Sequence, residues 1–360
     1  MPKEIKKLLI AASGTGGHII PALAIAEEMN KSWEISWLGI KKRCEDTIVP
    51  EKYKLFNLNI DSPNKKNLLL ILQYVKIIFS TIRVINILKE RKINLVFTTG
   101  GYISAPAILA AKIINIPVVI HESNLIPGTV TKYFGFLCDS VLIGFKETEF
   151  YLHKCNIKLT GTPLRRDFYK KTKLPNWVPS GNGPLLLVMG GSQGAVALNE
   201  IIYESLDFFV NKNIRLVHIV GNNNLNKKLK KYKNYVQICY TNDIPGLMSN
   251  CDLVVSRSGA GTINELIETK KPSILIPYPN SKNGHQKKNA SILASRGGSI
   301  LLDQNFLSVD IFQSILKRVF KLSANKRNYK ILDLMKENMN NIQRIDSKKE
   351  IKVFLNNLIK

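Results

Sequence analysis

The sequence predicts an α/β fold built from two doubly wound, parallel-sheet domains. Apolar runs that favour strands alternate with helical patterns along the 360 residues. Two of these runs, Leu8–Ala12 and Leu185–Met189, lead into the glycine-rich loops Ser13–His18 and Gly190–Ala195. Such loops bring backbone N–H groups and a helix N-terminus close to a phosphate. Two of them, about half a chain apart, indicate two similar domains that face each other across a cleft.

The other apolar runs are short and continuous, as expected for strands of a parallel sheet that helices cover on both faces. We expect these strands at Ile35–Leu38, Leu95–Thr98, Val118–Ile120, Ser140–Ile143, Leu216–Val220, Leu253–Ser256 and Ile274–Pro277. Prolines and glycines concentrate between Gly161 and Gly183, which predicts a domain boundary there. The Lys- and Asn-rich sequence from about Ala324 onward reads as helices.

The formal net charge of +25 favours a polyanionic partner, such as nucleic acid, an anionic membrane or a phosphorylated substrate. Solvated surface lysines explain it equally well, because they are spread along the whole chain. The five cysteines include no C-x-x-C pair, so a disulfide framework or zinc site is not expected. Met1–Lys7 lacks a signal peptide's apolar stretch, and no run approaches the roughly 20 apolar residues of a membrane span. We therefore expect a cytoplasmic protein, unless it adheres to a membrane surface.

The first glycine loop does not fit a dinucleotide-binding site. Ile19 stands where the third glycine of G-x-G-x-x-G belongs, and the second strand ends without an acid for a ribose hydroxyl. The lysine of a P-loop is also absent. His18 stands where the helix begins, and a neutral imidazole there could act as a general base. The alternative is a structural histidine that is hydrogen-bonded to nearby backbone.

A third strand–loop–helix pattern covers Ser256–Glu265. Arg257 could pair with a phosphate, and Glu265, about one turn beyond Gly261, could accept hydrogen bonds from ribose hydroxyls. The alternative for Glu265 is an acid that stabilises the positive end of the helix. Gln286 and Asn289, spaced i, i+3 after a polar loop, share one helix face.

Two further segments place polar residues where ligands bind in open α/β sheets. His121–Asn124 follows the strand Val118–Ile120, at the carboxyl end of the sheet. Gly161–Arg165 reads as a turn that presents an arginine near the domain boundary. The chain contains no D-x-D motif, so we expect arginine, helix dipoles and backbone amides, without a metal ion, to stabilise a leaving phosphate.

The segment Asn67–Lys89 is mostly apolar, with one narrow polar stripe made of Gln73, Lys76, Ser80 and Arg83. One interpretation is a crossover helix packed on the sheet, with a second helix after it. The other, which we favour for part of the segment, is an apolar patch whose basic rim, including Lys65 and Lys66, docks on an anionic membrane.

Taken in order, these motifs resemble the family 28 glycosyltransferases that form lipid II in bacterial peptidoglycan synthesis. No single motif is decisive, but the ordered set is specific and runs over most of the chain. The matching stretches are Gly14–His18 with Pro21–Leu23, Gly100–Tyr102, His121–Asn124, Gly161–Arg165, Gly190–Ala195, Arg257–Ala260 with Thr262 and Glu265, and His285–Gln286 with Asn289.

The resemblance implies the GT-B fold, with an acceptor domain at residues 1–162, a UDP-GlcNAc domain at 163–340 and a C-terminal helix at 341–360 that packs back on the first domain. It implies transfer of GlcNAc from UDP-GlcNAc to lipid I, with inversion, no cofactor, and peripheral attachment to the cytoplasmic face of the inner membrane. His18 or Glu122 would be the catalytic base. The implied substrate-binding residues are Thr15, Gly16, Gly17, Asn124, Arg165, Ser192, Gln193, Arg257, Ala260, Gly261, Thr262, Glu265, Gln286 and Asn289.

The resemblance leaves two rival functions open. One is a related transferase that glycosylates another lipid, such as diacylglycerol, although the chain lacks a long N-terminal targeting extension. The other is a non-enzymatic, basic protein that binds polyanions, although no nucleic-acid-binding motif is present and we expect no nucleic-acid partner. Other cell-wall synthesis proteins stay open as partners. Ser13, Thr162 and Asn283 depart mildly from the family pattern, which affects individual contacts more than the function.

Overall fold

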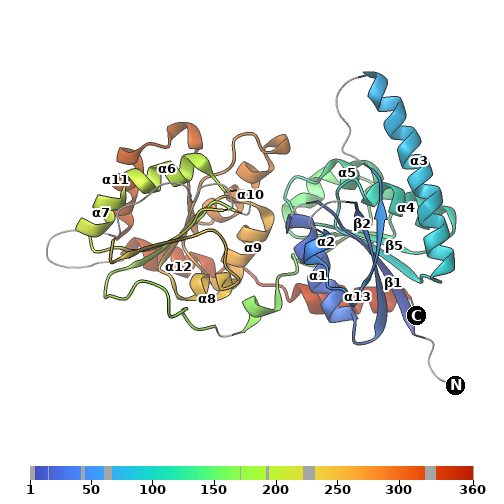
Figure 1. Ribbon diagram of the computed structural model, residues 1–360, viewed down its shortest axis with the longest axis horizontal. Coiled ribbons are helices and arrows are strands. Elements are labelled where there is room, and N and C mark those ends of the chain that lie inside the picture. Colours follow the sequence, from blue (N-terminus) through green and yellow to red (C-terminus); the bar gives the residue numbers. More distant parts are fainter. Residues whose placement is uncertain are drawn as a thin grey trace. The chain divides into compact units, whose positions relative to one another are not determined.

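The computed structural model describes residues 5–14, 16–41, 45–60, 67–170, 172–191, 194–221, 232–320 and 330–359, and only the backbone at 46 and 67–74. The chain divides into two compact α/β units (Figure 1). The first unit contains residues 1–165 together with 345–360, and the second contains residues 166–344. The chain therefore leaves the first unit once and returns to it near its end.

The first unit is built on a seven-stranded, fully parallel sheet in the order β3-β2-β1-β4-β5-β6-β7. Its strands are β1 (Lys6–Ala11), β2 (Trp33–Ile40), β3 (Lys54–Leu58), β4 (Leu95–Thr98), β5 (Val118–Glu122), β6 (Ser140–Ile143) and β7 (Ile157–Leu159). The α-helices are α1 (Gly16–Met29), α2 (Glu45–Ile48), α3 (Asn67–Glu90), α4 (Ser104–Ile113), α5 (Thr129–Phe134) and α13 (Ser347–Leu358). Short 3-10 helices cover Gly135–Leu137 and Lys146–Tyr151.

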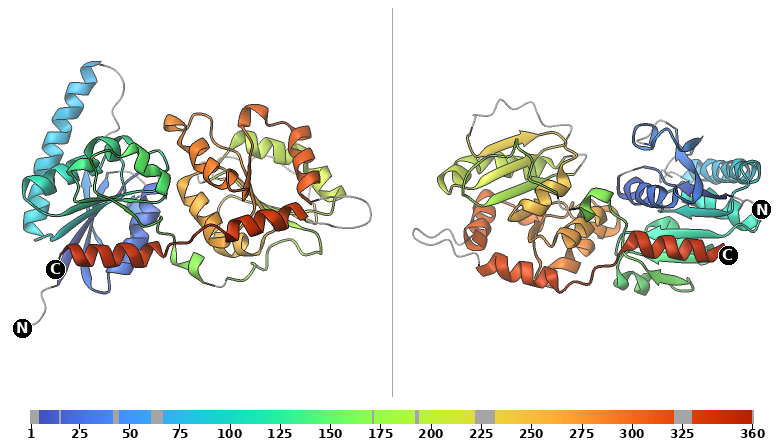
Figure 2. Two further views of the ribbon diagram at one scale, coloured as in Figure 1. Left: turned by 180° about the vertical axis from the view of Figure 1, so that it is seen from behind. Right: turned by 90° about the horizontal axis from the view of Figure 1, so that it is seen from below.

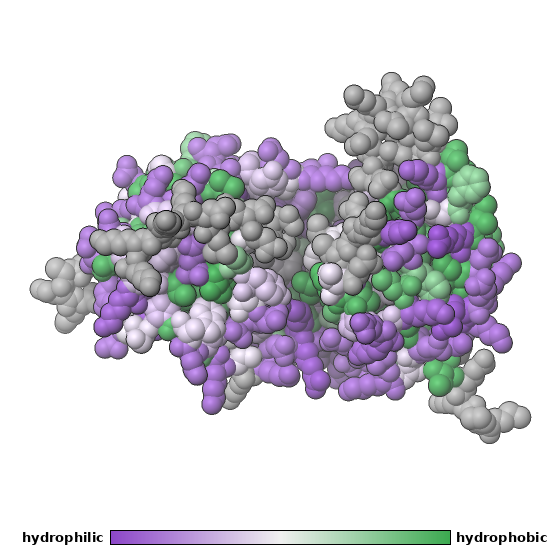
Figure 3. All heavy atoms as spheres, viewed as in Figure 1, coloured by the Kyte–Doolittle hydropathy of each residue, from purple (hydrophilic) through white to green (hydrophobic). Residues whose placement is uncertain are grey.

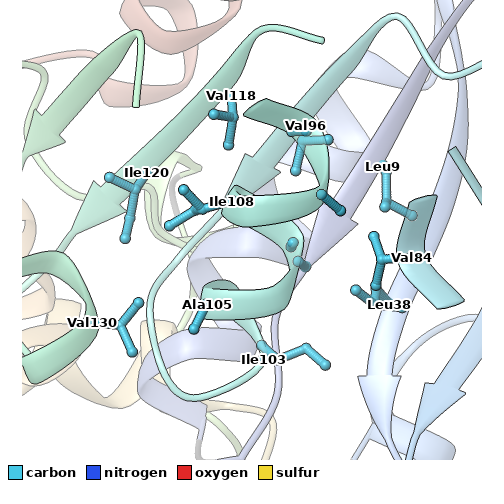
Figure 4. Close-up of a cluster of buried hydrophobic side chains, with 14 of the residues drawn as sticks. Leu9, Leu38, Val84, Val96, Ile103, Ala105, Ile108, Val118, Ile120 and Val130 are labelled. Atoms are coloured by element: carbon cyan, nitrogen blue, oxygen red, sulfur yellow. The ribbon is translucent and has the colours of Figure 1, made fainter. Parts of the chain in front are cut away.

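Helices cover both faces of this sheet, which explains why its central strands are continuously apolar. On one face Val84 of α3 and Ile108 of α4 pack on the strands, and Figure 4 shows Ile108 among Val96, Val118 and Ile120. On the other face α1 and α13 pack on Leu8 and Ile10 of β1, with Ile351 and Leu355 of α13 fully buried.

Figure 2 shows α13 lying along the first unit, and polar contacts also hold it there. Lys352 pairs with Glu28 of α1 at 2.8 Å, and the Trp33 indole donates to Asn356 over 2.8 Å. The chain enters α13 beside Gly161, where a Cβ would lie 2.5 Å from the Ser347 hydroxyl. Glycine at 161, with a φ of +69°, therefore leaves the room that the returning chain occupies.

The second unit is built on a six-stranded parallel sheet in the order β10-β9-β8-β11-β12-β13. Its strands are β8 (Leu185–Met189), β9 (Arg215–Ile219), β10 (Tyr235–Ile238), β11 (Leu253–Ser256), β12 (Ser273–Leu275) and β13 (Ser299–Leu301). Its α-helices are α6 (Val196–Glu204), α7 (Leu206–Asn211), α8 (Ile244–Asn250), α9 (Ala260–Thr269), α10 (His285–Ala294), α11 (Val309–Phe320) and α12 (Lys330–Asn340). Short 3-10 helices cover Arg166–Tyr169, Lys282–Gly284 and Gln304–Phe306.

The expectation of two parallel α/β domains is confirmed, and each strand expected from an apolar run is present. The apolar segment Asn67–Lys89 forms one helix, α3, from Asn67 to Glu90. The polar stripe predicted there is not continuous at the surface. Ser80 is buried, whereas Lys76 and Arg83 are exposed.

Candidate active site

The polar motifs predicted from the sequence gather at the carboxyl ends of the parallel strands of each unit. In the first unit they follow β1, β4, β5 and β7, and in the second they follow β8, β11 and β12. Loops at this edge of an open α/β sheet are the usual place for ligands. Thr15, Ser192 and Gln193, which the sequence analysis assigns to substrate binding, lie outside the described residues.

His18, in the first turn of α1, is held by the backbone of the loop after β4. Its Nδ1 lies 2.6 Å from the Thr99 carbonyl oxygen, and the Thr99 hydroxyl donates to the His18 carbonyl over 2.9 Å. A carbonyl oxygen only accepts, so the Nδ1 atom carries the proton. In the neutral ring this leaves the Nε2 atom with a lone pair that can take up a proton.

Two glycines form the surface on which the His18 ring lies. Gly100 and Gly101 have φ values of +90° and +77°, a conformation that residues with a side chain rarely adopt. A Cβ at Gly100 would lie 3.3 Å from His18 Cε1, and one at Gly101 would lie 3.9 Å from Nε2. Two glycines are required at positions 100 and 101, because they adopt the positive φ of the turn and leave space for the imidazole of His18.

The carboxylate of Glu122, at the end of β5, is buried and fully used by its own loop. One oxygen accepts from the Asn124 backbone N–H at 3.0 Å and from the Asn124 side chain at 3.1 Å. The other accepts from the Gly128 N–H and the Thr131 hydroxyl, both at 2.8 Å. These four bonds fix the loop between β5 and α5 and set the orientation of the Asn124 side chain.

His121 connects the same strand to the predicted turn Gly161–Arg165. Its buried Nε2 lies 2.8 Å from the Gly161 carbonyl oxygen, to which it donates. Burial lowers the pKa of His121, so the ring stays neutral. Arg165 follows this turn and is half-buried. The structure thus brings His18, Glu122 and Asn124 to one edge of the first sheet. The hydrogen bond from His121 to Gly161 attaches the turn that contains Arg165 to the same edge.

The second glycine loop is tightly folded against the end of β9. Gly191 and Gly194 have φ values of +82° and +76°, and the Gly194 N–H donates to the Gly191 carbonyl over 2.9 Å. A Cβ at Gly190 would lie 2.7 Å from the Ala195 nitrogen. A Cβ at Gly191 would have no heavy atom of the described chain within 4 Å. Gly190 and Gly194 are therefore closely packed against the neighbouring backbone, whereas the space beside Gly191 is free of other described residues.

The loop between β11 and α9 is open at the start of the helix. Gly259 occupies the N-cap position, and no described side chain caps the first N–H groups of α9. A Cβ at Gly259 or at Gly261 would have no heavy atom of the described chain within 4 Å. Ala260, Gly261 and Thr262 thus form a helix N-terminus with space in front of it, which suits an anion. Glu265 lies one turn further along and is half-buried.

Arg257 and two residues of α10, Gln286 and Asn289, hydrogen-bond to the backbone around this loop. The Arg257 guanidinium donates to the carbonyls of Ile276 and Pro277 at 3.0 and 3.2 Å, and to the Gln304 side chain at 2.7 Å. Gln286 accepts from the Tyr278 N–H, and Asn289, fully buried, donates to the Ser258 carbonyl. The geometry gives Arg257, Gln286 and Asn289 partners that shape the loops after β11 and β12. Arg257 could pair with a phosphate, but its protein partners alone explain its position.

Sequence reasoning missed a buried polar pair in the second unit. His218, the fourth of the five residues of β9, has no exposed surface, and its Nε2 lies 3.0 Å from the Asn199 side-chain oxygen of α6. The signal was present, because a histidine inside the apolar run Leu216–Val220 needs a buried partner. Within the described ranges, no group of three or more His, Cys, Asp or Glu side chains has the arrangement of a metal site.

Comparison with known proteins identifies the family. The model of the glycosyltransferase family 28 N-terminal domain matches residues 8–143, and that of the C-terminal domain matches residues 185–348. A curated relative from Prochlorococcus marinus strain MIT 9515 is 62% identical over 100% of both chains. The chain belongs to glycosyltransferase family 28. A second relative, from strain NATL2A, is 45% identical over 93% of this chain and 94% of its own.

Both of these family members carry the name UDP-N-acetylglucosamine–N-acetylmuramyl-(pentapeptide) pyrophosphoryl-undecaprenol N-acetylglucosamine transferase. Among solved structures, Acinetobacter baumannii MurG matches with a TM-score of 0.74 and 22% identity, over 96% of this chain and 98% of that one. The calicheamicin glycosyltransferase CalG4 matches with a TM-score of 0.68 and 12% identity, over 98% and 99%. The fold is the GT-B fold of such glycosyltransferases, as the sequence motifs predicted.

Proposed function

We propose that this family 28 enzyme transfers GlcNAc from UDP-GlcNAc to the muramyl 4-hydroxyl of lipid I, forming lipid II with inversion at the anomeric carbon. The observation that carries the proposal is the 62% identity, over the full length, to a transferase named for this reaction. A Cβ at Gly14 in the first unit, like one at Gly259 or Gly261 in the second, would have no heavy atom of the described chain within 4 Å. Both units thus have an open loop at their strand ends, which is consistent with a donor and an acceptor that both contain a diphosphate.

In this proposal the second unit binds the donor. The open N-terminus of α9 and the glycine loop after β8 supply backbone N–H groups for the UDP phosphates and for the charge that develops as UDP leaves. Glu265 accepts hydrogen bonds from the ribose hydroxyls. Arg257, Gln286 and Asn289 support the site indirectly. Their hydrogen bonds to backbone atoms fix the loops that surround the nucleotide.

The first unit then supplies the acceptor site and the base. The Gly14–Gly17 loop faces the acceptor pyrophosphate, and His18 Nε2 takes the proton from the muramyl hydroxyl as its oxygen attacks the anomeric carbon. The hydrogen bond from Nδ1 to the Thr99 carbonyl fixes the tautomer that this step requires. Glu122, with four donors on its carboxylate, positions Asn124 and its loop, and we assign it no proton transfer.

Transfer of labelled GlcNAc to a lipid I analogue, with the purified full chain, tests the function. We expect turnover with this acceptor and none with diacylglycerol, and full activity in EDTA because the chain lacks a D-x-D motif. Glycosylation of diacylglycerol alone would contradict the proposed acceptor. Loss of turnover in EDTA that magnesium or manganese restores would contradict the metal-independent mechanism.

Replacing Glu265 by alanine is expected to weaken UDP-GlcNAc binding at least about tenfold, because hydrogen bonds to a charged group are worth roughly 1.5–3 kcal/mol. Calorimetric titration measures the affinity. Glu268→Ala is the control, because it removes a carboxylate from the same helix, far from the helix N-terminus, where Glu268 pairs with Arg344. Donor affinity should stay unchanged in this variant. Equal donor affinity in the wild type and Glu265→Ala would refute the ribose assignment.

We also propose that α3 docks the enzyme on an anionic membrane from the cytoplasmic side. Val75, Ile78, Phe79 and Ile82 form an exposed apolar stripe at helical spacing, and Figure 3 shows hydrophobic side chains along this part of α3. Ile78 and Phe79 are 59% and 68% exposed. Lys76 and Arg83 flank the stripe, while Lys65 and Lys66 lie outside the described residues. In the described chain, no helix combines the length and hydropathy that a membrane span requires.

The double variant Ile78→Ser, Phe79→Ser is expected to bind anionic vesicles about tenfold or more weakly, since burying one large apolar side chain is worth about 1.5–3 kcal/mol. Co-sedimentation with vesicles measures this, and UDP binding should stay unchanged. Phe306→Ser removes an equally exposed aromatic ring, 69% exposed, from the second unit and serves as the control. Unchanged vesicle binding by the double variant would make α3 an ordinary surface helix.

A further inference from the structure

The buried pair of His218 and Asn199 does more than fill the core of the second unit. Asn199 is 1% exposed, and its side-chain N–H donates to the Val220 carbonyl over 3.2 Å, which leaves its oxygen as the acceptor. His218 therefore carries its proton on Nε2 and donates it to that oxygen. Burial lowers the pKa of His218 to about 3, so the ring is neutral and the donor stays in place at working pH.

These contacts fix the chain where β9 ends. The N–H groups of Val220 and Gly221 donate to Ile238 and Cys239 on the neighbouring strand side, at 3.0 and 3.1 Å. The Val220 carbonyl, on the opposite side, is held by Asn199. The strand end is thus bound from both sides and cannot shift without breaking buried hydrogen bonds.

The fixed strand end is the surface on which the second glycine loop rests. Gly221 has a φ of +76°, and a Cβ there would lie 2.5 Å from the Gly194 nitrogen and 3.1 Å from the Gly191 carbonyl oxygen. The Gly190 N–H also donates to the Ile219 carbonyl over 3.3 Å. The backbones of Gly221 and of the loop are in direct contact, so the position of one determines that of the other.

We propose that His218 and Asn199 are positioning residues, which hold Val220 and Gly221 so that Gly190, Gly191 and Gly194 of the loop after β8 keep the positions that bind the diphosphate of the donor. This inference rests on the proposed function, in which that loop contacts the donor phosphates. Glu265 holds the ribose separately. Loss of the pair therefore weakens the phosphate contribution to binding and spares the nucleoside contribution.

The test compares UDP with uridine, because the two ligands differ by the diphosphate alone. We expect Asn199→Leu and His218→Leu to bind UDP about tenfold more weakly and uridine as the wild type does, in calorimetry with the full chain. His218→Gln keeps an N–H near the position of Nε2 and should restore UDP binding. Tyr203→Phe is the control, because the Tyr203 hydroxyl accepts from Gln237 within the same polar cluster, whereas Asn199 is the residue that holds the Val220 carbonyl.

Gly221→Ala tests the support of the glycine loop by Gly221 without changing the buried pair. It serves as the test of the proposal if the two leucine variants do not fold. Its Cβ would push on the Gly194 backbone, so UDP binding should again fall without loss of uridine binding. Two outcomes would overturn this inference but leave the proposed function intact. In one, a variant loses affinity for UDP and uridine equally; in the other, every folded variant prefers UDP over uridine as strongly as the wild type does. A wild type that binds UDP no better than uridine would overturn the donor-loop assignment as well.

Discussion

Replacing His18 by alanine is expected to lower kcat by about 10²–10⁴-fold, the usual contribution of a positioned base, with little change in donor affinity. The reason is the fixed tautomer: Nδ1 donates to the Thr99 carbonyl over 2.6 Å, which leaves Nε2 free of a proton in the neutral ring. Turnover of a lipid I analogue at saturating UDP-GlcNAc measures the effect, and calorimetry measures donor affinity.

The variant His18→Asn separates proton transfer from support of the loop. An asparagine amide can take the place of Nδ1 and donate to Thr99, but it has no second nitrogen to act as a base. We therefore expect His18→Asn to be as slow as His18→Ala. Near-normal kcat in His18→Asn would show that His18 acts through its hydrogen bond to Thr99, and a different group would have to be the base.

The second large effect is expected at Glu122. Its carboxylate is buried and accepts four hydrogen bonds, so Glu122→Ala leaves at least the Gly128 N–H and the Thr131 hydroxyl without their acceptor. Each buried donor left unsatisfied costs about 1–3 kcal/mol. We expect kcat/KM to fall on the order of 10²–10³-fold as the loop that carries Asn124 loses its fixed shape. Steady-state kinetics with both substrates measures the loss.

Two milder variants distinguish this positioning role from the role of base. Glu122→Gln keeps one acceptor oxygen, and Thr131→Val removes one donor without changing shape, so both should give intermediate activity. A base offers no such intermediate, because an amide cannot take up the proton. Equal and near-complete loss of kcat in Glu122→Ala and Glu122→Gln, together with near-normal kcat in His18→Ala, would make Glu122 the base.

The central strands could be predicted from the sequence, whereas the edge strands could not. β3, β7, β10 and β13 were missed, and they are the outermost strands of the two sheets. Their residues are mostly half-buried, unlike the fully buried β4, β5 and β8. An edge strand has one flank without a neighbour, so it does not require a continuous apolar run. A run such as Ile157–Leu159, with Lys158 in its centre, therefore gives little signal.

The site could be predicted as a set of loops, but not as a set of roles. Glycine spacing located the loops because backbone conformation requires glycine there, as at Gly191 and Gly194. Partner choice depends on residues far apart in sequence, and a local pattern does not contain it. Arg257 is bound to the loop after β12, and Glu122 to its own loop. His218 and Asn199 meet across 19 positions of sequence.

The return of the chain to its first unit has a consequence for biosynthesis. A ribosome makes every residue of the second unit before it reaches Ser347, where α13 begins. The second unit can therefore fold while synthesis continues, whereas the first waits for Ile351 and Leu355 to cover β1 and α1. A message truncated just before α13 would still encode all the strands of both sheets. Its product would keep apolar surface of β1 and α1 exposed on the first unit, a kind of surface that favours aggregation.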